Sequence, residues 1–136
     1  MAESAYQFRL PGQLEVGVGA HRSIAERALG LGRRVLCVSD RNCVRIPEVA
    51  ATVDALRAGA DAFELFADVP GEPTTDEVER GLAAAGRIEA AVVVGIGGGS
   101  VLDTAKAVAA MATNPGTIVD YMGRDRLTAR RLPLVL

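Results

Sequence analysis

The stretch AAVVVGIGGGSVLDTAKAVAAMA, residues 90–112, joins an apolar run to a helix-like pattern through four glycines in five positions. The apolar run lacks polar alternation, which is typical of a strand covered on both faces of a parallel sheet. From Ser100 onward, apolar residues at helical spacing predict a helix that Ser100 opens. Glycines at such a junction let backbone N–H groups approach a ligand, and a helix N-terminus attracts an anion. The stretch therefore predicts a phosphate-binding turn, although a purely structural strand-to-helix turn would need glycines too.

The remaining chain alternates helical patterns with apolar runs. Expected strands are residues 34–39, 62–66, 90–96 and 132–136, and expected helices are residues 21–31, 46–58, one from Thr74 and one from Ser100. Thr74 and Glu77 have the spacing of a capping box. Alternating segments at 6–11 and 13–19, joined at Pro11–Gly12, predict an N-terminal β-hairpin. The expected fold class is therefore α/β, a parallel Rossmann-like sheet with helices on both faces and an N-terminal hairpin.

Composition and charge exclude several classes of function. The chain has 136 residues, a net charge of −2 and no Trp, which argues against nucleic-acid partners and a membrane surface. Cys37 and Cys43 form no metal or disulfide pattern, and no segment reads as a signal peptide or membrane span, so we expect a cytoplasmic protein. His21 is the single histidine. We therefore predict neither a metal ligand nor a catalytic residue within these 136 residues.

Asp40 is a candidate ligand of a ribose. It directly follows the apolar run at 34–39, at the expected carboxyl end of a parallel strand. A carboxylate there can bind both hydroxyls of an adenosine ribose and repel a 2′-phosphate, which predicts NAD rather than NADP. The competing interpretation is a turn residue within SDRN, and the neighbouring Arg41 favours a 2′-phosphate. Asp103 also has two interpretations, a surface ion pair with Lys106 or an acceptor for a ligand hydroxyl or amide.

The segment GGGSVLDTAKAVA, residues 97–109, resembles the GGGSxxDxAK segment of the iron-containing (group III) alcohol dehydrogenases. VLCVSD at 35–40, FADVPGEPTTDEVERGL at 66–82 and ATNPGTIVDYMG at 112–123 resemble further segments of that family in the same order. The resemblance implies that residues 1–136 are an N-terminal dinucleotide-binding domain. It also implies a C-terminal helical domain that holds one divalent metal, usually Fe²⁺, with an Asp and three His. We therefore expect the chain to be a fragment, inactive by itself.

The resemblance also implies roles for particular residues. The pyrophosphate is expected on Gly97, Gly98, Gly99 and Ser100, and the helix start is expected to line the cofactor site through Val101, Leu102 and Asp103. The implied reaction is hydride transfer between a small alcohol or aldehyde and NAD, with the metal polarising the alcohol oxygen. Glu72 stands where many members carry Asn, so this chain departs from the family pattern at that position.

Two alternatives remain at this point. One is another enzyme of the same architecture: glycerol dehydrogenase, maleylacetate reductase or 3-dehydroquinate synthase. The other is a nucleotide-binding module without catalysis. The sequence identifies neither the substrate nor the metal, and it leaves a homo-oligomer open.

Overall fold

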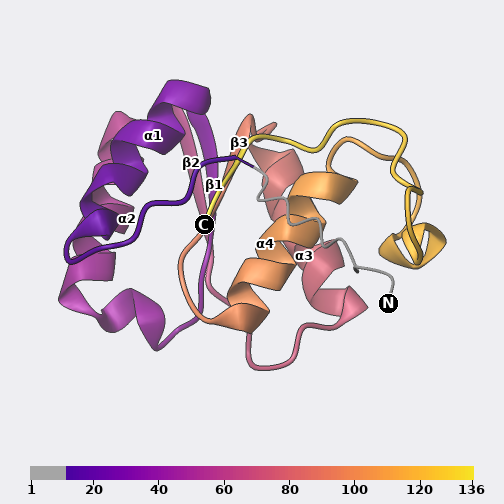
Figure 1. Cartoon of the computed structure of the whole chain (residues 1–136), viewed down its shortest axis with the longest axis horizontal. Coiled ribbons are helices and arrows are strands. Elements are labelled where there is room, and N and C mark those ends of the chain that lie inside the picture. Colours follow the sequence, from indigo (N-terminus) through magenta and orange to yellow (C-terminus); the bar gives the residue numbers. More distant parts are fainter. Residues whose placement is uncertain (1–11) are drawn as a thin grey trace, which may run out of the picture.

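A four-stranded, all-parallel sheet with the strand order β2-β1-β3-β4 organises the chain (Figure 1). The computed structural model describes residues 12–136. The strands are β1 (Arg34–Val38), β2 (Ala62–Phe66), β3 (Val92–Gly95) and β4 (Leu134–Val135). The α-helices are α1 (Ile24–Leu31), α2 (Pro47–Gly59), α3 (Thr75–Arg87) and α4 (Gly99–Met111), with 3₁₀ turns η1 (Ala20–Ser23), η2 (Cys43–Arg45) and η3 (Ile118–Tyr121).

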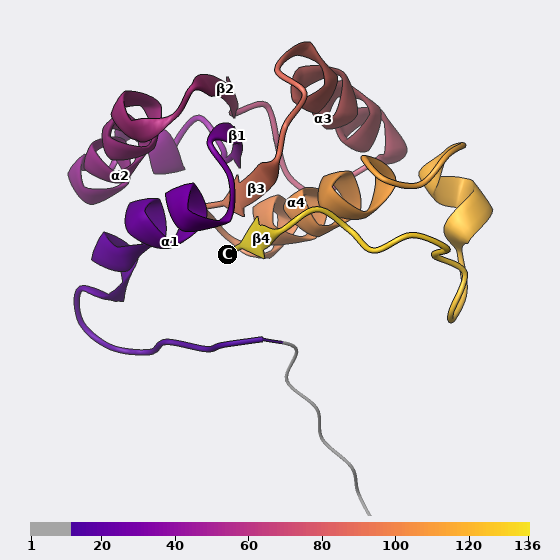
Figure 2. The ribbon, with the colours of Figure 1, turned by 90° about the horizontal axis from the view of Figure 1, so that it is seen from above.

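Helices cover both faces of the sheet, with α1 and α2 on one side and α3 and α4 on the other (Figures 1 and 2). Val35 and Cys37 belong to the core beneath the first pair, and Leu36 and Val38 belong to the core beneath the second. All four side chains are fully buried. The continuous apolar strands follow from this double coverage, because neither face of the strand meets water. The predicted α/β class with helices on both faces is confirmed.

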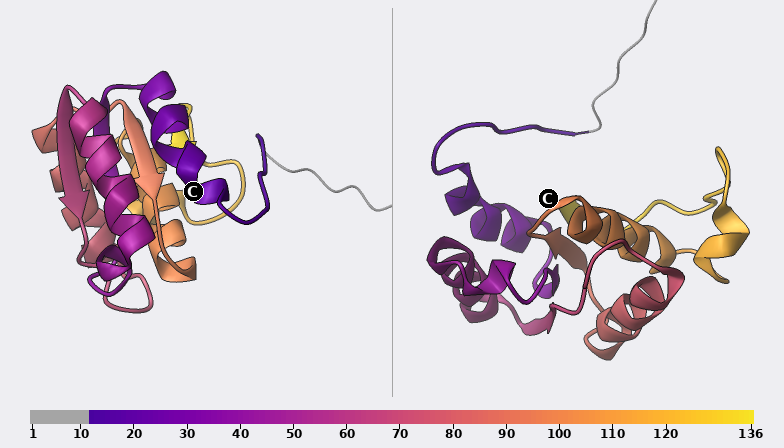
Figure 3. Two further views of the ribbon diagram at one scale, coloured as in Figure 1. Left: turned by 90° about the vertical axis from the view of Figure 1, so that its left-hand side faces the viewer. Right: turned by 90° about the horizontal axis from the view of Figure 1, so that it is seen from below.

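The direction of winding reverses between β1 and β3. From β1 the chain passes through α2 to β2 on one side, and then returns through α3 to β3 on the other side of β1. The strand arrows in Figure 3 (left) run downward, and its right panel looks onto the edge where they end. In open α/β sheets, ligands bind at the carboxyl ends of the strands, where the strand order reverses. This edge is therefore where the fold places a site.

Hydrogen bonds join the carboxyl ends of β1 and β3. Ser39, which is fully buried, donates a hydrogen bond from its hydroxyl to the carbonyl oxygen of Ile96 at 2.7 Å. The N–H of Ile96 in turn donates to the carbonyl of Val38 at 3.0 Å. These bonds hold the start of the glycine-rich turn against the end of β1.

The helix boundaries agree with the sequence pattern, with two corrections. The helix expected from residue 21 begins as the 3₁₀ turn η1, and α1 itself starts at Ile24. The capping box at the start of α3 is confirmed, because the Thr74 side chain accepts from the backbone N–H of Glu77 and the Glu77 carboxylate accepts from the backbone N–H of Thr74. Ser100 was expected to open the following helix, but α4 begins at Gly99 with Gly98 as its N-cap. The glycine backbone already takes up the extended N-cap conformation, so no serine side chain is needed there.

The second arm of the expected N-terminal hairpin is not a strand in the described residues. The first arm, residues 6–11, lies outside the described residues, and the second arm, residues 13–19, forms no strand. The alternating apolar side chains of that arm are exposed, at 69% for Leu14 and 85% for Val16. Alternation sets which side chains share a face, but a strand also needs a hydrogen-bonding neighbour. Among residues 12–136 this arm has none in a sheet.

The segment between α4 and β4 is held by one buried side chain. Asn114 accepts hydrogen bonds from the backbone N–H groups of Thr128 and Ala129 and donates to the carbonyls of Ala110 and Ala129. The polar loop before β4 is thereby fixed to the end of α4. None of the helices within residues 12–136 is both long and apolar enough to cross a membrane.

Candidate cofactor-binding site

A cavity of about 690 Å³ lies at the carboxyl edge of the sheet, which is within the range of small-molecule sites. Its walls come from the loops after β1, β2 and β3 and from α3 and α4. The lining residues are Asp40, Arg41, Asn42, Ala67, Asp68, Val69, Pro70, Gly71, Arg80, Gly98, Gly99, Ser100 and Val101.

The glycines of the turn divide into two kinds. A Cβ at Gly95 would lie 2.8 Å from the Leu136 side chain, and one at Gly97 would lie 2.8 Å from the Val101 side chain. These two glycines are required by close packing. A Cβ at Gly98 or Gly99 would meet nothing within 4 Å.

Neither packing nor backbone conformation requires a glycine at 98. Its φ of −80° and ψ of −175° are extended values that any residue adopts. Gly98 and Gly99 both line the cavity, so open space for a ligand is the physical reason that remains. A purely structural turn would account for Gly95 and Gly97 but not for these two.

The N-terminus of α4 faces the same cavity. No side chain caps the helix, so the first backbone N–H groups are not used within it. The partial positive charge of the helix end adds to these donors and favours a phosphate. The buried Val101, 2% exposed, closes the wall behind them.

Asp40 lies across the cavity, after β1. Its Oδ1 accepts hydrogen bonds from the N–H groups of Asn42 at 2.9 Å and Cys43 at 2.8 Å. One oxygen therefore holds the turn into η2, as the competing interpretation of the sequence expected. No hydrogen bond within the described chain uses Oδ2, so one carboxylate can serve both the turn and a ligand.

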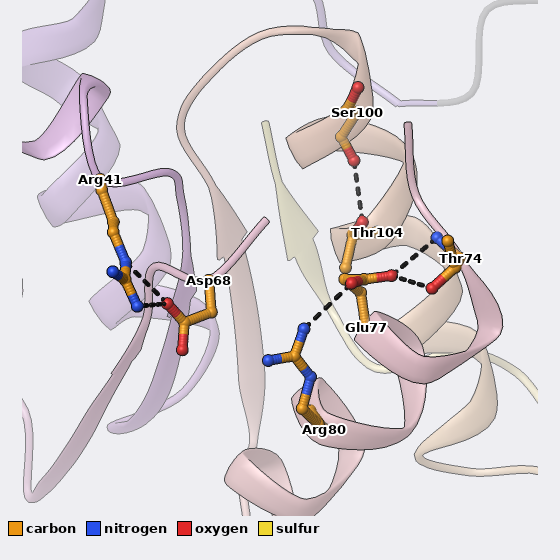
Figure 4. Close-up of polar contacts among 7 residues, drawn as sticks. All are labelled: Arg41, Asp68, Thr74, Glu77, Arg80, Ser100 and Thr104. Atoms are coloured by element: carbon orange, nitrogen blue, oxygen red, sulfur yellow. Dashed lines mark hydrogen bonds and ion pairs between the residues drawn. The ribbon is translucent and has the colours of Figure 1, made fainter. Parts of the chain in front are cut away.

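Arg41 is bound by a residue that the sequence analysis missed. Its Nε and Nη2 both donate to Oδ1 of Asp68, at 2.9 and 2.6 Å (Figure 4). Asp68 follows β2 by two residues, as Asp40 follows β1. The strands pair with Val38 opposite Phe66, and the two aspartates form a β-bridge beyond them. In the sequence, an Asp two residues after each of these strands was the signal that could have indicated this pair.

Arg80 supplies a second cation to the cavity, and it was also missed. Its Nη2 donates to Oε1 of Glu77 at 3.0 Å (Figure 4). Its guanidinium also lies 5.9 Å from the centre of the Phe66 ring. Hydrogen bonds from Thr74 lower the pKa of Glu77, and the bond from the Thr74 hydroxyl has a larger effect than the bond from its backbone N–H. The positive charge of Arg80 lowers this pKa further. The capping box thus keeps Glu77 ionised beside Arg80.

Comparison with known proteins identifies the family. The family model for iron-containing alcohol dehydrogenases matches residues 11–136. The chain belongs to the iron-containing alcohol dehydrogenase family. The resemblance carried by the GGGSxxDxAK segment is therefore confirmed.

Relatives and solved structures of the iron-containing alcohol dehydrogenases agree with this assignment. The chain is 32% identical to a sulfoacetaldehyde reductase of Bilophila wadsworthia, over 88% of this chain and 31% of the relative. It is 32% identical to the long-chain-alcohol dehydrogenase 1 of Geobacillus thermodenitrificans, over 98% and 35%. An alcohol dehydrogenase from Oenococcus oeni superposes with a TM-score of 0.84 at 26% identity, over 96% of this chain and 35% of the other.

An NADH-dependent butanol dehydrogenase from Thermotoga maritima superposes with a TM-score of 0.80 at 29% identity, over 96% of this chain and 33% of the other. The chain thus spans about a third of the curated relatives and of these structures.

Three residues expected at the cofactor from the family resemblance lie outside the cavity lining. Gly97 packs against Val101, as described above. The Leu102 side chain lies against Gly95, 3.6 Å from where a Cβ would be. Asp103 lies in the second turn of α4 and pairs with Lys106 at 3.0 Å, with its side chain 64% exposed. The geometry of Asp103 is therefore that of a surface ion pair.

The family's metal has no set of ligands in the part of the chain that the structure describes. Residues 12–136 bring together no group of three or more His, Cys, Asp or Glu side chains suited to a metal. His21 lies in η1, at the start of the described chain. Burial raises the pKa of the Cys37 thiol to about 12, and Cys43 is half-buried. Glu72 is exposed and does not line the cavity.

Proposed function

We propose that the chain provides the NAD-binding part of a metal-dependent alcohol dehydrogenase. The observation that carries this proposal is the cavity that Gly98 and Gly99, free of any packing requirement, line at the uncapped start of α4, together with Asp40. A dinucleotide needs both features, an anion site for its pyrophosphate and an acceptor for its ribose hydroxyls. The turn at Gly98 and Gly99 fits the cofactor because a Cβ at either of these two residues would enter the cavity.

The backbone and side-chain groups of the site then have distinct roles. The N–H groups of Gly99, Ser100 and Val101 donate to the pyrophosphate. Oδ2 of Asp40 accepts from the adenosine ribose while its Oδ1 keeps the turn in place. Gly97 and Leu102 support the turn by packing. Asp103 lies outside the cavity lining, so it can accept a hydrogen bond only from a part of the cofactor that extends past the cavity.

The reaction of the whole protein is hydride transfer between a small alcohol or aldehyde and NAD. NAD supplies the hydride acceptor, and a divalent metal such as Fe²⁺ supplies Lewis-acid polarisation of the alcohol oxygen. This chain binds and orients the dinucleotide, and the metal ligands come from outside the described residues. The relatives act on different compounds by name, so the proposal extends to the alcohol or aldehyde class and no further.

Calorimetric titration of the full-length natural protein with NAD⁺ and NADP⁺ tests the proposal. Hydrogen bonds to a charged group contribute about 1.5–3 kcal/mol, and the Asp40 charge repels a 2′-phosphate, so NAD⁺ should bind about ten- to a thousandfold more tightly. Asp40→Asn keeps an oxygen for the turn but removes the charge, and should narrow that ratio. Failure of the wild-type protein to bind either dinucleotide would refute the proposal. A preference for NADP⁺ in wild type would refute the role of Asp40.

A further inference from the structure

We propose that Asp68 is a specificity-determining residue, which rejects a 2′-phosphate by holding the Arg41 guanidinium in an ion pair. This inference rests on the function proposed above, because it concerns the adenosine end of the same cavity. Asp40 offers a carboxylate to the ribose, but the next residue along the chain is a cation that could bind the phosphate of NADP. The structure shows what occupies that cation.

The guanidinium of Arg41 uses two of its donors on one oxygen. Nε and Nη2 lie 2.9 and 2.6 Å from Oδ1 of Asp68. Arginine binds phosphate through the same pair of donors, in a planar two-bond arrangement. A 2′-phosphate would therefore have to displace Asp68 to be bound in that way.

The charges at this end of the cavity also disfavour a phosphate. Asp40, Arg41 and Asp68 all line the cavity and together carry a net charge of −1. Arg80, the other cation of the lining, is paired with Glu77. Both cations of the lining thus have a carboxylate partner, and the excess charge next to Asp40 is negative.

The ion pair itself contributes little to stability, so it can be removed without unfolding the chain. The side chains are 78% exposed for Arg41 and 45% for Asp68. Exposed pairs of this kind contribute little because both charges stay hydrated. The backbone of Asp68 is placed independently, by its β-bridge to Asp40. Asp68→Asn should therefore leave the loop in place and release the guanidinium.

The opposite end of the same two strands provides a matched control. Arg33 precedes β1 and Asp61 precedes β2, and they pair through Nε and Oδ1 at 2.9 Å. Their side chains are 58% and 65% exposed, and neither residue lines the cavity. Asp61→Asn therefore makes the same change in charge, in the same kind of pair, away from the site.

The experiment is calorimetric titration of the full-length natural protein and its variants with NAD⁺ and NADP⁺. Asp68→Asn should tighten NADP⁺ binding about three- to tenfold, because a freed guanidinium can pair with the phosphate, and should leave NAD⁺ within about twofold. Asp61→Asn should change neither affinity. Adding Arg41→Gln to Asp68→Asn should abolish the gain. Arg41→Gln alone removes a positive charge and leaves the Asp68 carboxylate without its partner, so it should weaken NADP⁺ binding more than NAD⁺ binding.

The outcomes separate this inference from the proposal beneath it. Wild-type protein that binds no dinucleotide refutes the proposed function, and this inference with it. Wild-type protein that binds NAD⁺ supports the function. The role of Asp68 is then refuted by an unchanged NADP⁺ affinity in Asp68→Asn, by an equal gain in Asp61→Asn, or by a gain that survives the loss of Arg41. If Asp68→Asn does not fold, Asp68→Ser makes the same change in charge, and an unchanged NADP⁺ affinity in that variant would refute the role of Asp68.

Discussion

Gly98→Val should weaken dinucleotide binding at least about tenfold while leaving the fold almost unchanged. The added Cβ meets no atom within 4 Å, and the extended backbone at this position suits a β-branched residue. Valine is a poorer N-cap than glycine, which costs a few tenths to about 1 kcal/mol. Reduced freedom of the unfolded chain offsets about 0.4–1 kcal/mol of that. The net change in the free energy of unfolding should therefore stay below about 1 kcal/mol.

The effect on binding is much larger because the isopropyl group enters the cavity beside the first N–H groups of α4. Blocking one or two hydrogen bonds to a charged phosphate costs about 1.5–3 kcal/mol each, which corresponds to a loss of at least about tenfold and typically a hundredfold in affinity. Gly97→Val is the contrasting variant. Its Cβ would lie 2.8 Å from the Val101 side chain, so it should destabilise the fold by about 1–3 kcal/mol through overpacking.

Two measurements on each variant decide the matter, urea unfolding for stability and calorimetric titration with NAD⁺ for affinity. Gly30→Val, which adds a side chain in open space on α1 away from the cavity, controls for the substitution itself. An unchanged affinity in Gly98→Val would show that no ligand approaches this glycine. A loss of stability as large as that of Gly97→Val would show that the turn itself requires glycine at 98.

Four further predictions concern other parts of the chain. Thr74→Ala should lower the free energy of unfolding by about 0.5–2 kcal/mol through loss of the α3 cap, measured by urea unfolding. Because the pKa of Glu77 is lowered below its usual 4.5, its ionised form stabilises the fold above that pH; the stability difference between wild type and Glu77→Gln should shrink as the pH falls through the lowered pKa, and a constant difference would contradict this. A thiol reagent at pH 8 should label Cys43 in the folded chain and Cys37 only after unfolding, because burial raises the Cys37 pKa to about 12; rapid labelling of both would contradict this. The 136-residue chain alone should bind no stoichiometric divalent metal and oxidise no alcohol, and metal analysis or NADH absorbance would reveal either.

The fold was predictable because its signals are local and repeated. Unbroken apolar runs identified β1 and β3 as strands covered on both faces, and the Thr74–Glu77 spacing identified the start of α3. The strand expected at 13–19 was wrong, since alternation specifies which side chains share a face but not a pairing partner. Ser100 was misplaced because cap preferences favour serine, whereas the glycine backbone before it already serves as the cap.

The candidate site was predictable in outline and not in its ion pairs. Strand ends and glycines indicate where a ligand can approach, and both can be recognised from the local sequence. The pairing of Arg41 with Asp68 joins two loops, and it depends on the register of β1 and β2. Likewise, the sequence cannot separate Gly97 from Gly98. Only the position of the Val101 side chain shows that one glycine serves packing and the other faces the cavity.

The hydrogen bond from Ser39 to Ile96 has a consequence for the thermodynamics of association. Because β1 and β3 are joined at their tips, the entry to the glycine turn is already ordered in the free protein, and the loss of backbone entropy there belongs to folding rather than to ligand capture. A ligand then meets donors that need no rearrangement. The heat capacity change on association should accordingly reflect only the apolar area that the ligand itself covers, with no contribution from coupled folding.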